Sequence, residues 1–567
     1  MESKLTMAGS PGYGTIDKTS AFERPPYHPI TSIMNPFKDL TGYFIFLLLT
    51  STIGPLLFGY HLAELNAPQD VITCARKSIS TSTLVRLASH VGYATPTVGG
   101  EDEGLPQCIP MNPTQFGLVS SFFTLGGLIG ALSAGPMSAK YGRLKTMLYT
   151  NPMFIIGGAV EAIAPNVGIM TLGRFIAGLG AGAAVVVVPI YISEVAPPHE
   201  KGFFGAFTQV MINVGILIAQ LLGYFLSRGQ LWRLILGAGG AIGAIQLVSL
   251  ILGGQESPKW VADNGMPSRA KRVLRRLRGH EANIDEEVTG WGCESPEDLD
   301  DEEETLLSGR DHMRGHSASD SSANGGAEPE RTNYESAKKH TKNAASEAKR
   351  GTVGTLAVLR HPDYSPAVFA VMMIMVAQQL CGINSIVMYG VSLLSDLLAA
   401  NSAVLNVAVA ALNVIITTAC APLVDVLGRK TCLLGSIAGM GTGSLMLAVG
   451  IMRHIPILSA VATIFFVASF GLGLGPIPFI LSSELVGAEA VGATQSWALA
   501  ANWVATFLVA QFFPIVNNAM PKGTVYFIFF GFALGFGTFI AWFVPETKGK
   551  ANAEEVWGRS KAQDRVD

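Results

Sequence analysis

A cluster of amide side chains interrupts a long apolar run in the second half of the sequence. Gln378, Gln379 and Asn384 lie around Gly382 within residues 368–389. In hydrocarbon, polar side chains are costly unless they face a cavity or a partner helix. A broken helix is tolerated at membrane depth where it lines a water-filled site. Because amides donate and accept hydrogen bonds without net charge, the cluster predicts half of a binding site for a neutral, hydroxyl-rich solute.

Other side chains within apolar runs predict the remainder of this site. Gln209, Asn413 and Asn502 are further amides in such runs. A single intramembrane amide can simply pack helices together, whereas several on facing helices favour a shared site. Flat or branched apolar side chains would contact the carbon side of such a solute. The candidates for these walls are Ile212, Ile216, Phe470, Phe479 and Trp503.

The composition places these amides in a membrane protein. Only 14% of the 567 residues are charged and the mean hydropathy is +0.38, against about 25% charged residues in an average soluble domain. The net charge of −3 argues against nucleic acid as a partner. The sequence has no evident nucleophile–base pair or metal-ligand cluster. We therefore expect no enzymatic activity and no cofactor.

Twelve apolar stretches are long enough to span a bilayer, which takes about 20 residues. They predict an all-α membrane protein with twelve transmembrane helices. Gly178 and Gly182, four residues apart, indicate close helix packing in the fourth stretch. The predicted spans are 41–64, 115–138, 144–164, 168–193, 203–226, 230–253, 364–394, 402–425, 431–452, 457–484, 491–517 and 522–544.

The segments outside the spans predict the topology and the domains. Basic residues between the second and third spans, between the eighth and ninth, and after the last span place both termini in the cytoplasm. Cys74 and Cys108 lie in the predicted extracellular loop 69–113. They either form a disulfide or remain two free thiols, and the sequence favours neither state. The two helical halves are expected at 41–253 and 364–544, with a disordered tail at 1–40 and a cytoplasmic tail at 545–567. A cytoplasmic linker, 254–363, joins the halves. It contains a basic amphipathic helix at 270–279 and a disordered insert at 283–350.

The two halves repeat each other. Gly142-Arg143 recurs 286 residues later as Gly428-Arg429, and Glu194 recurs 290 residues later as Glu484. Parallel repeats of six helices build rocker-type transporters with the site between the halves. Acids lie beside bases at matching span ends on the cytoplasmic side of both halves, which orientation signals alone do not explain. These charged residues are Arg143, Arg174, Glu194, Lys201, Glu256, Arg429 and Glu484.

Several motifs resemble the signatures of the sugar porter family of the major facilitator superfamily, most closely its GLUT-type, protozoan-type hexose transporters. The resemblance implies facilitative hexose transport by alternating access, through a protein that works as a monomer in the plasma membrane. It places Gln209, Gln378, Gln379, Asn384 and Asn413 at sugar-contacting positions. It also makes Tyr389 an outer gate, and it implies that the cytoplasmic charges named above pair between helices and hold the inner gate shut. Gly382 would let the outer end of this span swing, with Tyr389 at the lid. The motifs are Gly135-x6-Gly142-Arg143, Gly173-Arg174-Phe175, residues 189–194, residues 255–259, Gln378-Gln379-Leu380-x-Gly382-Ile383-Asn384 and residues 545–549.

His61 leaves the mode of transport open. Proton-coupled relatives tend to carry aspartate at this position and GLUT-type facilitators asparagine. A histidine titrates near neutral pH, so His61 is either a proton site, with Glu64 or Glu161 as partner, or a neutral hydrogen-bonding group. We expect the neutral role. The alternatives are a proton-coupled sugar symporter and a non-transporting sugar receptor of the same fold.

Overall fold

The structure is a computed structural model, and all the residues that it describes belong to one compact unit, Thr41–Asp567. The predicted tail 1–40 and nearly all of the insert 283–350 lie outside the described residues. The described residues are 41–75, 105–197, 200–279, 284, 287–288, 354, 356–398, 401–487, 490–550 and 553–558.

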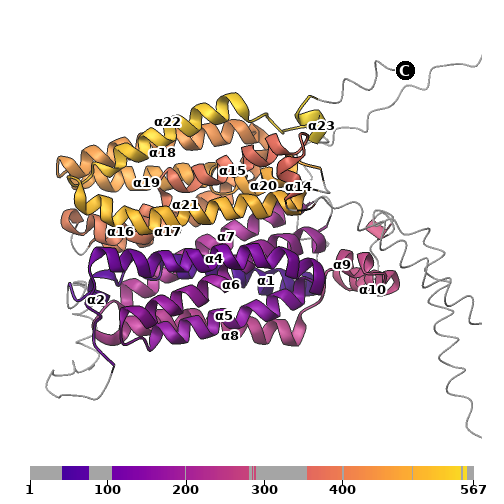
Figure 1. Ribbon diagram of the computed structural model, residues 1–567, viewed down its shortest axis with the longest axis horizontal. Helices are drawn as coiled ribbons and strands as arrows, with labels where there is room; N and C mark the ends of the chain where they lie inside the picture. The colour runs from indigo at the N-terminus through magenta and orange to yellow at the C-terminus, as the bar shows by residue number, and fades with distance from the viewer. Residues whose placement is uncertain are drawn as a thin grey trace, which may run out of the picture. The chain divides into compact units, whose positions relative to one another are not determined.

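Long helices account for both halves of the chain (Figure 1). The first half contains α1 (Gly42–Ala63), α4 (Pro113–Tyr141), α5 (Arg143–Ala162), α6 (Val167–Val195), α7 (Lys201–Leu226) and α8 (Trp232–Gly253). The second half contains α15 (Ser365–Leu380), α16 (Ile383–Leu398), α17 (Asn401–Leu427), α18 (Arg429–Met452), α19 (Pro456–Leu472), α20 (Ile477–Glu484), α21 (Val491–Ala519) and α22 (Val525–Phe543). Short helices are α2 (Gln69–Ile72), α9 (Pro258–Asp263), α10 (Pro267–Arg278), α14 (Ala357–Arg360) and α23 (Ala553–Val556).

These helices confirm the predicted all-α fold of twelve membrane-spanning segments. Eleven segments of the described chain are long and apolar enough to cross a membrane. The twelfth is α5, whose 20 residues include Arg143, Lys145, Asn151 and Glu161 and are therefore less apolar. It packs between α6 and α8, so it is part of the same bundle.

Glycines bring the helices of the first half close together. Gly178 and Gly182 of α6 lie against the backbone of Phe123 and Gly127 on α4, where an added Cβ would overlap that backbone. Close approach of this kind strengthens dispersion contacts between helices in a membrane. The packing role predicted for this pair of glycines is confirmed.

Two helices of the second half are broken. The break between α15 and α16 falls at Gly382, whose φ of +99° suits glycine. This agrees with the interruption expected there. The second break, between α19 and α20, lies within the predicted span 457–484, which the structure contains as one membrane-crossing segment, Pro456–Ser482. It falls at residues 473–476, where Gly473, Gly475 and Pro476 disfavour a continuous helix.

The two halves meet along α4 with α21 and α7 with α17. In Figure 1 the first half is the indigo-to-magenta group of helices and the second half is the orange-to-yellow group. Cys74 and Cys108 form a disulfide just beyond α2, which settles the open question about these cysteines. We call the end of the bundle that carries this disulfide the outer end, and the opposite end the inner end.

The predicted basic amphipathic helix is α10, at the inner end (Figure 1). It ends at Gly279, whose φ is +93°. Its apolar side chains are buried, and Arg278 Nη1 donates to the backbone carbonyl of Val195 at the end of α6 (2.7 Å). Thr41, which caps α1, donates to the carbonyl of Leu277 (2.7 Å). The helix is thus fixed to the first half.

Candidate functional site

Four predicted site residues form one hydrogen-bonded group, which we call the amide network: Gln378, Gln379, Asn384 and Asn502. Asn502 Nδ2 donates to Gln378 Oε1 (2.7 Å), and Asn384 Nδ2 donates to Gln379 Oε1 (2.5 Å). Gln379 Nε2 donates to Asn502 Oδ1 (3.3 Å). The four amides therefore bond one another. Hydroxyl groups that donate and accept could exchange into these bonds with little net cost.

The second helix break supplies partners that the sequence did not reveal. Gln378 Nε2 donates to the backbone carbonyls of Leu474 (2.8 Å) and Gly475 (3.0 Å). These carbonyls are available because α19 ends at Leu472 and α20 begins only at Ile477. The two broken helices thus hold each other at the amide network. The signal in the sequence was the Gly473-x-Gly475-Pro476 pattern.

The other two predicted amides belong to a second group, which joins the halves. Asn213 of α7 links them: its Oδ1 accepts from Gln209 (3.3 Å) and from Asn413 (3.2 Å), and its Nδ2 donates to Thr417 (2.9 Å). Asn213 was not predicted, although it lies one helical turn after Gln209 on the same face. Among the described residues, no hydrogen bond joins this group to the amide network.

The predicted apolar walls divide between the two halves. Trp503 is 2% exposed and points to the first half, where its ring lies edge-on to Phe58 (5.4 Å between centroids) and covers Gly127. Ile212 and Ile216 are buried on α7. Phe470 is buried at the end of α19, and Phe479 is half-buried on α20.

The outer end is closed by contacts between the halves. Asn66, after α1, donates through Nδ2 to the Val387 carbonyl (2.8 Å) and accepts at Oδ1 from the Val391 amide (3.0 Å) on α16. Tyr389 is buried, with its hydroxyl donating to the Ala510 carbonyl (2.5 Å) and its ring edge-on to Phe116 of α4. Tyr389 therefore lies where an outer gate would be, beneath a direct link between α1 and α16.

Charges at the inner end repeat between the halves. Arg143 pairs with Glu194 (2.7 Å), and Arg429 pairs with Glu484 (2.9 Å). Glu256 accepts from the Arg143 backbone amide (2.8 Å), at the start of α5. Glu546 accepts likewise from the Arg429 amide (2.9 Å), at the start of α18. The side chain of Lys201 lies outside the described residues.

These two ion pairs do not join one half to the other, as a gate between the halves would. The Arg143–Glu194 and Arg429–Glu484 pairs each join helices of one half, so in this arrangement they fix the inner ends of the separate halves. Carboxylates at helix N-termini also stabilise α5 and α18 by accepting from otherwise unpaired amides. The internal repeat is therefore structural as well as sequential.

The placement of Arg174 with the inner charges was wrong. Arg174 lies near the start of α6, toward the outer end, because the fourth span runs from the outer end to the inner end. It is fully buried, and its Nη1 donates to Glu64 Oε1 (2.5 Å) and to the His61 carbonyl (2.7 Å). Glu161 Oε2 lies 4.0 Å from the same nitrogen.

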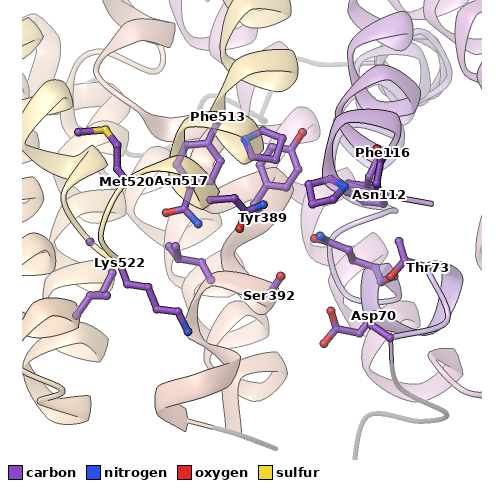
Figure 2. Close-up of a pocket in the computed structure, with 18 of the residues that line it drawn as sticks. Asp70, Thr73, Asn112, Phe116, Tyr389, Ser392, Phe513, Asn517, Met520 and Lys522 are labelled. Carbon is purple, nitrogen blue, oxygen red and sulfur yellow. The ribbon is translucent and has the colours of Figure 1, made fainter. Parts of the chain in front are cut away.

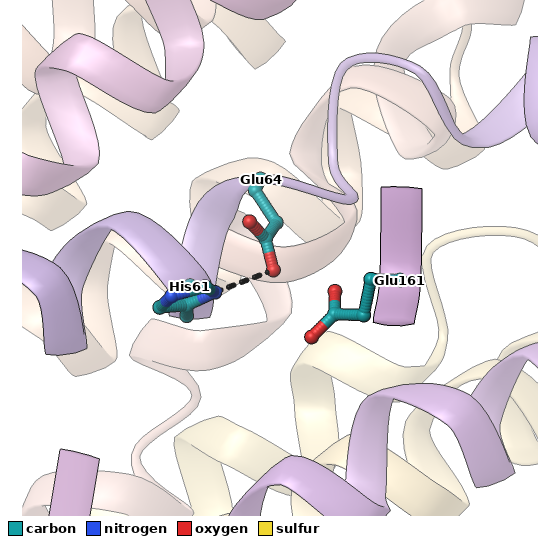
Figure 3. Close-up of side chains that lie close together, drawn as sticks. All are labelled: His61, Glu64 and Glu161. Atoms are coloured by element: carbon teal, nitrogen blue, oxygen red, sulfur yellow. Dashed lines mark hydrogen bonds and ion pairs between the residues drawn. The ribbon is translucent and has the colours of Figure 1, made fainter. Parts of the chain in front are cut away.

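His61, Glu64, Glu161 and Arg174 form a fully buried group, which we call the charge cluster. Figure 3 shows the first three, with the His61 Nδ1 2.9 Å from Glu64 Oε1. One ligand atom of each of the three lies within 4.8 Å of the others, a spacing that could suit a metal ion. The Arg174 guanidinium already supplies a positive charge to both carboxylates, so the cluster is poorly suited to a cation.

Comparison with known proteins agrees with this architecture. The family described as sugar (and other) transporter matches residues 47–314 and 309–556. A probable metabolite transport protein of Saccharomyces cerevisiae is 31% identical over 520 residues, covering 91% of this chain and 96% of its own. The facilitated glucose transporter member 2 of Sus scrofa is 27% identical over 542 residues, covering 91% and 93%.

A solved structure matches the fold. The xylose transporter XylE from E. coli, in a partially occluded inward-open conformation, aligns with a TM-score of 0.63 and 22% identity. The alignment covers 90% of this chain and all of that one. Together with the family match, this shows that the chain belongs to the sugar porter family of the major facilitator superfamily and is a sugar transporter.

Proposed function

We propose that this protein carries hexoses of the glucose type down their gradient by alternating access. The observation that carries the proposal is the amide network, in which four uncharged amides meet at two helix breaks. A neutral polyol matches this group because each hydroxyl donates and accepts. The similarity to a protein named a facilitated glucose transporter favours a hexose as the substrate.

The contacts between the halves support alternating access. The halves are linked at the outer end through Asn66, while the described inner ion pairs each stay within one half. A rocker mechanism alternates between an arrangement closed at the outer end and one closed at the inner end, and these contacts fit the first. Opening the outer end breaks the bonds of Asn66 and releases Tyr389 from Phe116.

Counterflow in proteoliposomes tests the proposal. Vesicles are loaded with D-glucose, D-galactose, D-fructose or D-xylose and then diluted into radiolabelled D-glucose. We expect transient accumulation of label in vesicles loaded with a transported hexose, without any ion gradient. Absence of counterflow with every hexose would reject hexose as the substrate class.

Proton-coupled transport is a second candidate, favoured by the charge cluster. Two buried carboxylates face one buried arginine, and His61 contacts one of the carboxylates. An unbalanced buried charge is costly, so charge neutrality requires one bound proton in the cluster. A site that holds one exchangeable proton could couple its release to the movement of α1 against α6.

Uptake against pH separates the two modes. A facilitator equilibrates sugar and is insensitive to a protonophore, whereas a symporter accumulates sugar above equilibrium when the outside is acidic. Accumulation that is abolished by a protonophore and lost in His61→Asn would replace the facilitative proposal. Glu161→Gln should have the same effect if the cluster holds the coupled proton.

We also propose that the chain acts as a monomer in the plasma membrane, with both termini in the cytoplasm. The disulfide supports this orientation, since disulfides persist in oxidising compartments. A vacuolar membrane would satisfy the same requirement, and a vacuolar protein sorting-associated protein of Saccharomyces cerevisiae is 29% identical over 509 residues. Imaging a fluorescent fusion beside a vacuolar marker distinguishes the two membranes.

A further inference from the structure

A cavity of about 730 Å³ opens at the outer end (Figure 2), and we call it the outer cavity. Its walls contain none of the four residues of the amide network, and Tyr389 is the one predicted gate residue among them. The cavity therefore lies on the outer side of the closed gate. Its size falls within the range of about 300–1,000 Å³ that is typical of small-molecule sites.

The walls come from both halves. In Figure 2, Asp70, Thr73, Asn112 and Phe116 of the first half lie on one side, and Lys522 of the second half lies on the other. Between them are Tyr389, Ser392, Phe513 and Asn517, on α16 and α21. A ligand here would contact both halves while the outer gate is closed.

The chemistry of the walls suits an uncharged polyol. Asp70 and Lys522 place one negative and one positive group on facing walls, so neither an anion nor a cation is favoured overall. The floor is aromatic: the Tyr389 and Phe513 rings stack with centroids 5.4 Å apart. Gln69 Oε1 is buried at the wall and finds no hydrogen-bond partner among the described residues. Such a group gains a bond from a hydroxyl donor.

We propose that the outer cavity is a second sugar-binding site, which holds a hexose at the closed outer gate. The inference rests on the proposed function, because it assigns the same class of ligand to both sites. Asn517, Ser392 and Gln69 would bond the hydroxyls, and the aromatic floor would contact the carbon side of the ring. Since the ligand bridges the two halves, its binding favours the arrangement with the outer end closed.

Protection of an introduced cysteine tests this site directly. Asn518 is exposed and lines the cavity, so Asn518→Cys can react with a membrane-impermeant thiol reagent added outside. Arg453→Cys, exposed at the same end but not lining the cavity, is the matched control. The chain without either substitution gives the background. L-Glucose controls for sugar composition, since only its handedness differs from that of D-glucose.

We expect D-glucose, and not L-glucose, to slow labelling at Asn518→Cys about tenfold at ten times its Kd. Labelling at Arg453→Cys should not change. The protection should persist in Gln379→Ala, which disables the amide network, and should disappear with Asn517→Leu. An unchanged labelling rate without sugar and a monodisperse elution profile show that each variant is folded.

Two results would overturn the inference: no protection by D-glucose, or protection that disappears in Gln379→Ala. The second result would mean that sugar at the amide network alters labelling at a distance. Wild-type counterflow is measured in the same vesicles. Normal counterflow without protection rejects the outer site alone, whereas absence of both rejects the proposed function as well.

Discussion

Asn66 links the two halves at the outer end, beside the contact of Tyr389 with Phe116, and Asn66→Ala should loosen this end. The side chain is 1% exposed and makes two short hydrogen bonds to the backbone of α16: Nδ2 donates to the Val387 carbonyl (2.8 Å) and Oδ1 accepts from the Val391 amide (3.0 Å). Nδ2 also makes a longer contact with the Ile386 carbonyl (3.4 Å). Each of the two short bonds contributes about 1 kcal/mol net. Removing both should therefore destabilise the outer-closed arrangement by about 2 kcal/mol.

A change of about 2 kcal/mol shifts the balance between outer-closed and outer-open forms by about 25-fold. When the outer end opens, water satisfies both the Asn66 amide and the α16 backbone, so that form loses little in the variant. The expected result is a larger outer-open population. Transport should slow if closing of the outer end limits the cycle.

Spin labels at Arg228→Cys and Arg453→Cys report this opening. Both positions are exposed at the outer end, one in each half, and the other free cysteines are replaced by serine. Pulsed electron spin resonance should show a longer-distance population that grows in Asn66→Ala. Thr442→Ala is the matched control, because Thr442 is exposed and makes only a local bond to the Ala438 carbonyl (2.9 Å). Identical distance distributions in all three proteins would refute the role of Asn66.

Three further substitutions test separate parts of the account. Gly382→Ala should lower the free energy of unfolding by about 1–3 kcal/mol. The reason is that its φ is +99° and the new Cβ would lie 2.6 Å from the Phe529 ring. Thermal unfolding in detergent measures this change. Gly435→Ala, whose Cβ would meet only a Leu472 methyl at 3.9 Å, should change little, and equal unfolding temperatures would contradict the strain argument. Gln378→Leu removes the donor to the Leu474 and Gly475 carbonyls and should lower the free energy of unfolding by about 1–3 kcal/mol. It should also raise the KM for glucose. An unchanged KM would show that these bonds do not contribute to sugar binding. Arg143→Ala should cost about 2 kcal/mol, since both hydrogen bonds of its pair with Glu194 are charged and largely buried. A double-mutant cycle with Glu194→Ala that shows no coupling would exclude a stabilising pair.

The fold was largely predictable because hydropathy and glycine act locally. Span boundaries follow from runs of apolar residues, and Gly382 was recognisable as a break because amides surround it. The break between α19 and α20 was missed since glycines occur in most spans, where they usually serve packing. Its effect becomes visible only when Gln378, about a hundred residues earlier in the chain, donates to the freed carbonyls.

The site was predictable in its residue types and less so in its contacts. Amides in apolar runs indicated a polyol site, but which amides pair depends on how the helices cross. Asn213 was overlooked although it bridges Gln209 and Asn413. Arg174 was assigned to the inner end even though it lies near the outer start of an outside-to-inside span. Its partner Glu64 is 110 residues away, and such a pairing is decided by helix packing alone.

Counterflow of D-glucose in matched variants tests whether the amide network is the sugar-binding site. Gln379→Ala removes an amide that bonds both Asn384 and Asn502, whereas Gln246→Ala removes an equally buried amide that bonds Asn151 within the first half. We expect counterflow in the wild type and in Gln246→Ala, and none in Gln379→Ala. Counterflow in Gln379→Ala at the wild-type rate would contradict the assignment of the amide network as the sugar site.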